Sequence, residues 1–491
     1  MAKDAADTPF FQKRKSEGQI VVKGSYLLVH TRCMLTQLDP PKFDLESYIA
    51  NYDGFTRAER LRHIGSHSTY LAVDAYRTAI AEAKRGKNVK LYCDLVEELA
   101  QIAPEDSAAL TDTTWATEKT KKVEAEKEKL EHELKSYKNN MIKESIRMGN
   151  EDMGHFYYAT GDYSDAHKAY MRMREHCTSP KHLADMTLRL LLVSIAQKSW
   201  LTVQSHIAKV DSTQVKADEK AKLGPIISAC AGLAHMGASN YREAATAFIN
   251  TSPAFLTAEP IAGITWQREV LTGNDIAVYG GLCALASMDR SQLKDLVLDN
   301  NDFRNFLELE PHIRRAINLF CASKYSACLE VLENYRTDYL LDVYLSKVLS
   351  SVYGLIRRKS IVQYFIPFSC VTLDEMAAKF QTAGGDYATI EDELEAMINS
   401  GTLDARIDLV DRLLISPPTN PRYTVHADAL AMAQAYDHTL RLRLTRLNMM
   451  AAGFEVRQEK GSSKDAVYKD TSYGESISAS LRGIGSKMGF T

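Results

Sequence analysis

The stretch GHFYYATGDYSDAHKAY, residues 154–170, carries the pattern that decides the fold. Its glycines, aromatic residues and alanine fall at the spacing of a tetratricopeptide-type hairpin of two antiparallel helices. Small residues let the two helices approach closely, and the aromatic rings fill the seam between them. The stretch therefore predicts one unit of an α-helical repeat. The matching residues are Gly154, Tyr157, Gly161, Tyr163, Ala166 and Tyr170.

The same pattern returns further along the chain, first with the same offsets of 9, 3 and 4 residues and then as a weaker echo. The leading tyrosines of the three units are 78 and then 84 positions apart, or about two hairpins of ~40 residues each. We therefore predict a right-handed helical-repeat solenoid over residues 43–350, with an irregular helical bundle as the alternative. The later matches are Gly232, Tyr241, Ala244 and Phe248, then Tyr325, Cys328 and Leu332, with Trp200, Val203 and Ile207 in a degenerate hairpin between the first two units.

Beyond residue 350 the pattern changes to that of a winged helix, which we place at residues 351–420. Ile361–Phe365 is β-prone, and Thr372–Glu375 forms a capping box that opens a helix. After Gly384-Gly385, Thr389 is the predicted N-cap of a second helix, which Gly401 ends. Two strands follow, one alternating through Leu403, Ala405, Ile407 and Leu409 and one at Leu413–Ile415. The predicted core residues of this module are Leu373, Met376, Phe380, Ile390, Leu394 and Ile398.

The two ends of the chain differ from the segments beside them. Residues 1–42 mix polar, proline and short apolar pieces and are predicted to be a flexible arm. Residues 421–454 are predicted to form a long helix whose apolar stripe is left for a neighbouring helix to cover. Residues 455–491 are rich in glycine and serine and are predicted to be disordered. The stripe, a candidate assembly surface, consists of Ala433, Tyr436, Leu440, Leu444, Leu447 and Ala451.

Composition and charge narrow the class of protein. Apolar residues make up 45% of the 491 and charged residues 25%, as in ordinary globular chains, and the net charge of -3 provides no general attraction for nucleic acid or anionic membranes. The eight cysteines lack C-x-x-C pairs, which favours buried reduced thiols over zinc sites or disulfides. No secretory signal and no long apolar run is present, so we expect a soluble intracellular protein.

The sequence lacks the motifs of common catalytic sites. No phosphate-binding G-x-x-x-x-G-K-[ST] loop, H-E-x-x-H helix or G-x-S-x-G elbow occurs. His63 and His67 are one helical turn apart but have no further ligand in a recognisable pattern, so we interpret them as an incidental pair. We expect no catalytic residue, cofactor or metal in this chain.

The second helix of the winged-helix module raises the alternative of DNA binding, because such helices often enter the DNA major groove. In this sequence it carries Glu391, Asp392, Glu393 and Glu395 and no lysine or arginine. DNA phosphates would repel these carboxylates, whereas the helix N-terminus favours them. The sequence therefore predicts protein assembly rather than nucleic-acid binding. We expect the Glu393 side chain to face outward.

Helical repeats followed by QYFIPFSCVTLDEMAAKF (363–380) and IEDELEAMINSGTLDARID (390–408) resemble a PCI domain. This domain is shared by scaffold subunits of the proteasome lid, the COP nine signalosome and the third eukaryotic translation initiation factor. The segment DLESYIANYDGFTRAERLRHI (44–64) resembles the subunit-one family of the signalosome, and the related family in the proteasome regulatory lid is the alternative. The resemblance covers most of residues 44–450.

The resemblance implies a non-catalytic scaffold that supports removal of a ubiquitin-like modifier from cullins and so regulates cullin-RING ubiquitin ligases. The implied partners are other PCI and MPN-type subunits, with the zinc isopeptidase centre in a different subunit. The implied location is the cytoplasm and nucleus. A nucleic-acid-associated PCI subunit and a stand-alone enzyme are the other classes that we weigh. The first would need a basic winged-helix face and the second a catalytic constellation.

Overall fold

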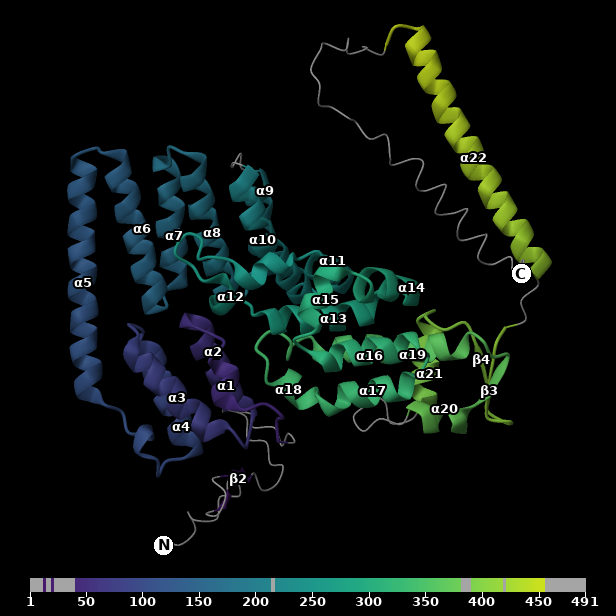
Figure 1. The fold of residues 1–491 in the computed structure, drawn as a ribbon, viewed down its shortest axis with the longest axis horizontal. Coiled ribbons are helices and arrows are strands. Elements are labelled where there is room, and N and C mark those ends of the chain that lie inside the picture. The colour runs from purple at the N-terminus through teal and green to yellow at the C-terminus, as the bar shows by residue number, and fades with distance from the viewer. Residues whose placement is uncertain are drawn as a thin grey trace. The chain divides into compact units, whose positions relative to one another are not determined.

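A computed structural model describes residues 12–14, 19–21, 40–212, 217–380, 390–417 and 421–454. The chain forms two structural units, Met1–Ser416 and Pro417–Thr491. The first unit is a series of helical hairpins that ends in a small module of helices and strands, and the second contains one long helix (Figure 1). The predicted fold class, a helical-repeat solenoid followed by a winged-helix PCI module and a long helix, is confirmed.

The N-terminal part of the first unit begins with two short antiparallel strands in the predicted flexible arm, β1 (Gln12–Arg14) and β2 (Gln19–Val21). The rest of the arm up to residue 39 lies outside the described residues. Helix α1 (Leu45–Ile49) starts at Asp44, whose carboxylate accepts the Ser47 N–H at 3.0 Å. Helices α2 (Gly54–His67), α3 (Ala72–Arg85) and α4 (Val89–Ile102) then pack around a small apolar core of their own.

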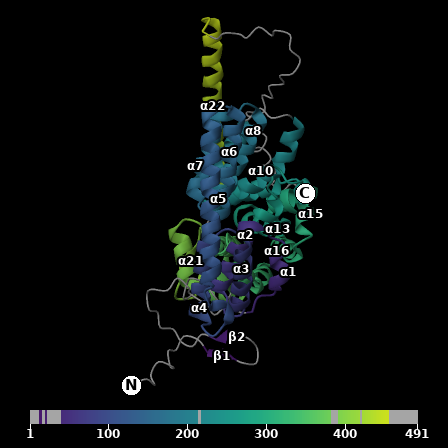
Figure 2. The ribbon, with the colours of Figure 1, turned by 90° about the vertical axis from the view of Figure 1, so that its left-hand side faces the viewer.

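Helix α5 (Thr113–Asn139) is a long helix rich in lysine and glutamate. Leu134 is its one fully buried side chain among the described residues, and lysine–glutamate pairs follow its exposed surface. Figure 1 shows α5 beside the hairpin of α6 (Lys143–Thr160) and α7 (Tyr163–Met173), with α8 (Pro180–Ala196) next in the row. Figure 2 views the same helices from the α5 side. Its interleaved charges leave no continuous basic stripe.

The repeat glycines lie where two helices touch. A Cβ atom built on Gly154 of α6 would come within 2.3 Å of the Tyr170 ring on α7, and one on Gly232 of α10 (Ala217–Gly237) within 2.7 Å of Phe248 on α11 (Tyr241–Ile249). Gly161 ends α6 with φ of +86°, a backbone conformation that side chains disfavour. The predicted hairpins at 154–170 and 232–248 are therefore confirmed, with α9 (Trp200–Ser212) as the degenerate element between them.

The remainder of the solenoid continues with shorter helices and turns. Their apolar faces join those of α8 to α11 in one core, which also includes the winged-helix residues up to Leu414. The elements are η3 (Pro253–Thr257), α12 (Trp266–Glu269), α13 (Gly273–Ser287), α14 (Arg290–Gln292), the π-helical η4 (Leu293–Leu298), α15 (Asn301–Leu307), α16 (Pro311–Cys321), α17 (Tyr325–Asn334), α18 (Arg336–Leu340) and α19 (Leu349–Phe365), with η1 (Ser107–Ala109) and η2 (Arg174–His176) earlier in the chain.

The winged-helix module consists of β3 (Cys370–Thr372), α20 (Leu373–Phe380), α21 (Ile390–Asn399), β4 (Arg406–Asp408) and β5 (Leu413–Ile415). Its three strands form an antiparallel sheet in the order β3-β5-β4. The predicted β character of Ile361–Phe365 is wrong, because these residues complete α19 and the first strand lies at β3. Gly384-Gly385 and the predicted N-cap Thr389 lie outside the described residues. Gly401 follows α21 with φ of +72°, as predicted for a helix end.

Helix α22 (Pro421–Ala451) forms the described part of the second unit. It is a single helix of 31 residues with no other described helix or strand in its unit. The predicted disordered tail, 455–491, lies outside the described residues.

Candidate functional site

A buried arginine joins the N-terminal helices to the middle of the solenoid. Arg60 of α2 is 0% exposed. Its guanidinium donates to Asp342 at 2.5 Å and to Asp275 at 3.0 Å, and it also contacts the hydroxyl of Tyr48 at 2.5 Å. Tyr279 of α13 donates to Asp342 at 2.7 Å. We call these residues, together with Tyr52, the Arg60 latch.

The latch neutralises charges that burial would otherwise make costly. Burial alone would lower the pKa of Arg60, but Asp275, the tyrosines and Asp342 hold this pKa well above its usual value. Burial likewise opposes ionisation of Asp342, yet Arg60 and the N–H of Leu345 keep the pKa of Asp342 below its usual value. Burial raises the pKa of Asp275, and Arg60 offsets only part of that rise. The guanidinium is therefore held charged between two carboxylates.

The latch sets the position of the N-terminal helices. Tyr48 and Arg60 come from α1 and α2, whereas Asp275 lies in the first turn of α13 and Asp342 follows α18. A second contact nearby joins Asp53 to Arg268 through an ion pair of 2.9 Å and a backbone hydrogen bond. The N-terminal helices and the solenoid are thus fixed to one another by polar contacts as well as apolar packing.

Sequence reasoning missed the latch. One signal was available, since Arg60 lies four residues from both Thr56 and Ile64 on the buried face of α2. Its acidic partners lie 215 and 282 residues further along the chain, where no local pattern marks them.

The predicted core residues of the winged helix lie inside the module. Ile390 and Ile398 are partly buried and pack against the same cluster as the others. The arrangement gives α20 and α21 a shared apolar face against the three-stranded sheet. The fully buried members are Leu373, Met376, Phe380 and Leu394.

The acidic helix α21 differs from its prediction at one residue. Glu393 is buried rather than facing outward, and its carboxylate accepts two contacts from Nε of Arg357 on α19 at 2.9 and 3.0 Å. Glu391 pairs with Arg412 at 2.8 Å, and Glu395 is exposed. The ion pair with Arg357 therefore ties α21 to the last helix of the solenoid.

The predicted assembly residues all lie on α22 and are exposed to solvent. Tyr436 is 66% exposed, Leu444 62% and Leu447 59%. All members of the predicted stripe lie on one side of the helix, because they recur at steps of three and four. The other members are Ala433, Leu440 and Ala451. Leu442 and Met449, 50% and 49% exposed, fall on the opposite side at this periodicity. Helix α22 therefore presents apolar side chains on two faces.

The histidine pair contains one ring, that of His63, which is half-buried and neutral at pH 7. The ring centroids of His63 and His67 are 4.1 Å apart, and Nε2 of His63 lies 3.2 Å from the Leu340 carbonyl oxygen. Burial, followed by the nearby His67, lowers the pKa of His63 to about 4. Across the described ranges, no group of three histidine, cysteine or acidic side chains is arranged to hold a metal ion.

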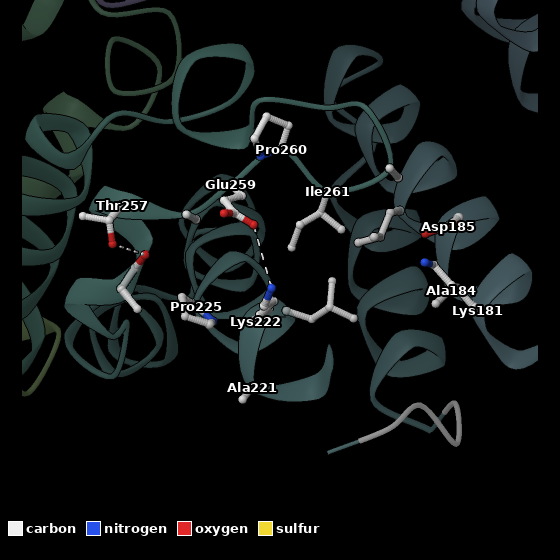
Figure 3. Close-up of a pocket in the computed structure, with 15 residues that line it drawn as sticks. Lys181, Ala184, Asp185, Ala221, Lys222, Pro225, Thr257, Glu259, Pro260 and Ile261 are labelled. Carbon is white, nitrogen blue, oxygen red and sulfur yellow. Dashed lines mark hydrogen bonds and ion pairs between the residues drawn. The ribbon is translucent and has the colours of Figure 1, made fainter. Parts of the chain in front are cut away.

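A cavity of about 720 Å³ lies between α8, α10 and the loop after η3 (Figure 3). Lys222 and Glu259 point toward one another there, 3.8 Å apart, and Pro225 and Ile261 contribute apolar walls. Its described lining contains no histidine, cysteine or serine, so it lacks the nucleophile–base pairs built on those residues. Within the portion of the chain that the structure describes, no helix has the length and apolar character to cross a membrane.

Comparison with known proteins agrees with this architecture. The family model described as "26S proteasome subunit RPN7" matches residues 112–296, and the PCI domain model matches residues 332–418. The COP9 signalosome complex subunit 1 of Emericella nidulans is 50% identical over 427 residues, covering 85% of this chain and 84% of that protein. The subunit 1 of Neurospora crassa is 42% identical, covering 85% of this chain and 92% of that protein.

The alternative family is more distant. The 26S proteasome regulatory subunit RPN7 of Saccharomyces cerevisiae is 20% identical over 56% of this chain and 62% of that protein. On identity and coverage together, the chain belongs to the family of COP9 signalosome complex subunit 1.

Proposed function

We propose that this chain is a non-catalytic scaffold subunit of a COP9 signalosome, supporting cullin deneddylation and the regulation of cullin-RING ubiquitin ligases. Family membership supports the complex. A scaffold role is supported by the fold, since most of the buried chain is helix packed on helix. The isopeptidase chemistry would belong to another subunit.

The observation that carries the proposal is the two-faced helix α22. A helix with apolar residues on opposite sides is suited to the interior of a helical bundle. Among the described residues of its unit no second helix is present to cover either face. An exposed apolar surface of this kind marks a site of protein contact. We infer that helices of neighbouring subunits cover α22 on both sides.

The partners that we propose are PCI and MPN-type subunits of the same complex, with cullin-RING ligases engaged through the assembled complex. The acidic residues of α21 argue against a nucleic-acid partner. We propose a cytoplasmic and nuclear location, in keeping with this role. A proteasome-lid role has weaker support because the RPN7 relative is the more distant one.

Truncation of tagged chains tests the proposal. A chain ending at Lys460 keeps α22 and should co-purify with neighbouring subunits as the full chain does. A chain ending at Tyr423 lacks nearly all of α22 and should lose most of them. The identity of the recovered subunits separates a signalosome from a proteasome lid. Equal recovery by the two truncated chains would mean that α22 does not carry assembly.

A further inference from the structure

A second cavity, of about 320 Å³, opens where the N-terminal helices meet the solenoid. Its floor is the Arg60 latch, since Tyr52, Asp275 and Asp342 line it. Its mouth is exposed at Lys42, and its walls are half-buried. The wall residues used below are Glu310, His312, Tyr335 and Asp338.

The cavity already holds one ammonium group. Nζ of Lys42 lies 4.2 Å from the centroid of the Tyr335 ring, and the backbone N–H of Lys42 donates to Asp338 at 2.9 Å. His312 stacks on Tyr335 with centroids 4.0 Å apart, and it contacts the Tyr339 hydroxyl at 2.7 Å. Tyr335 is thus held in place as a surface for a cation.

Negative charge exceeds positive charge around the cavity. The lining contains four carboxylates, two on the walls and two on the floor, whereas Lys42 is the one lysine or arginine in its described lining and Arg60 lies beneath it. Arg60 pairs with both floor carboxylates, and Lys42 lies beside Asp338. Glu310 has His312 at 3.3 Å and the Asn274 amide at 2.8 Å as its partners. Counting His312 as neutral, the site still has two more carboxylates than cations. Burial raises the pKa of Asp338, and the Lys42 N–H and ammonium offset only part of that rise. A further cation would complete the charge balance.

We propose that this pocket receives the arginine or lysine side chain of a partner polypeptide, beside Lys42. Aromatic rings combined with carboxylates are the chemistry that recognises guanidinium and ammonium groups. Lys42 is itself part of the lining, so the cavity volume is free for a second side chain. The partner contact lies in the first structural unit and is independent of the α22 assembly surface.

Binding of short peptides to the purified full-length chain tests the proposal. The probes are the blocked tripeptides Gly-Arg-Gly and Gly-citrulline-Gly, which differ in charge but hardly in shape, with binding measured by saturation-transfer NMR titration. The arginine peptide should bind about tenfold or more tightly than the citrulline peptide, because only the former carries a cation. Equal affinity for the two peptides would overturn the proposal.

Three variants locate the binding in this pocket. Glu310→Gln removes a wall charge and should weaken the arginine peptide by about fivefold, whereas Lys42→Met removes the resident cation and should strengthen it by a similar factor. Glu330→Gln, an exposed residue of α17 outside the lining, is the control and should change nothing. Loss of folding cannot produce opposite effects in the first two variants. Unchanged or weaker binding by Lys42→Met, or equal effects of the two glutamate variants, would refute the assignment.

Discussion

Arg60 shows how a single side chain can hold distant segments together. A buried guanidinium is tolerable only when carboxylates and hydroxyls replace the water that it has lost. Here Asp275 and Asp342 supply the charge, and Tyr48 adds a hydroxyl. Removing one member of such a group leaves the others buried without compensation, which costs more than the intact group contributes.

We expect Arg60→Ala to lower the free energy of unfolding by about 3–5 kcal/mol, because it leaves two buried carboxylates unpaired. The matched control is Arg85→Ala, whose side chain is 76% exposed and pairs with Glu82 on the surface at 3.2 Å. That change should cost no more than about 1 kcal/mol. Urea denaturation of the full chain measures both. Similar unfolding midpoints for the two variants would show that the latch contributes little to stability.

His63 makes stability depend on pH. Its folded pKa of about 4 lies below the unfolded value of 6.5, so the unfolded chain binds a proton that the folded chain does not. Stability due to this residue is therefore present above pH 6.5 and is lost as the pH falls toward 4. Between pH 7.5 and pH 5, the wild type should lose about 2 kcal/mol relative to His63→Gln. A constant difference between the two proteins over this range would contradict the burial effect.

At the scale of elements, the helical hairpins depend on contacts between a glycine and an aromatic ring. The ring of Tyr170 occupies the space that a side chain at position 154 would need, and Phe248 does the same opposite Gly232. Interiors packed this closely cannot absorb an added methyl group without moving a helix. The closeness of each helix pair therefore depends on these positions.

Gly154→Ala should destabilise the chain by about 1–3 kcal/mol through overpacking against Tyr170. Gly354→Ala is the matched control, since Gly354 also lies inside a helix, α19, but a Cβ atom there would meet nothing within 4 Å. The control should be stabilised by up to about 1 kcal/mol, because alanine favours the helix more than glycine does. Thermal unfolding measures both variants: the midpoint should fall for Gly154→Ala and rise for Gly354→Ala. Shifts in the same direction would contradict the packing argument.

The sequence pattern predicts those helices and turns that are determined by residues close together in the chain. The hairpin glycines, the start of α20 and the end of α21 at Gly401 follow from spacing and capping within one or two turns. Ile361–Phe365 was misjudged because the β propensity of five residues conceals the helical face of the longer segment, on which Val352, Ile356 and Phe365 are buried. Propensity gave way there to packing in the solenoid core.

The charged residues whose burial the sequence does not predict are buried because of partners far away in the chain. Glu393 belongs to a run of acids that is typical of an exposed helix start, and only Arg357, 36 residues earlier, explains its burial. The partners of Arg60 are more distant still. When a charged residue lies at helical spacing from apolar residues, the spacing predicts that its side chain is buried. A single sequence contains nothing that identifies the partner of that charge.

At the scale of the whole molecule, the solenoid and the winged helix share one core, while α22 belongs to a separate unit. Stability and assembly should therefore respond to different sets of residues. The first unit is held by apolar packing and the Arg60 latch. The second exposes apolar residues that no other described residue of its own unit buries.

Charged substitutions on each face of α22 should reveal how many neighbours cover it. Leu444→Lys lies on the predicted stripe and Leu442→Lys on the opposite side, so each should reduce co-purification of neighbouring subunits if both faces are buried in the complex. Gln434→Lys, an exposed polar residue beside the stripe, is the control and should retain them. The melting temperature of the first unit should be unchanged in all three. Loss with Leu444→Lys alone would mean that α22 has a neighbour on one side only.

The sequence separation within the latch has a consequence for synthesis on the ribosome. Asp342 follows Arg60 by 282 residues, and translation at about 5–20 residues per second takes roughly 15–55 s to cover that distance. During that interval the N-terminal helices have emerged while Arg60 lacks Asp342 and, for the first 215 residues, Asp275 as well. A prematurely terminated chain never acquires Asp342, so its N-terminal part stays open to chaperones and proteases. Closure of the latch thereby distinguishes a nascent fragment from a chain translated past residue 342.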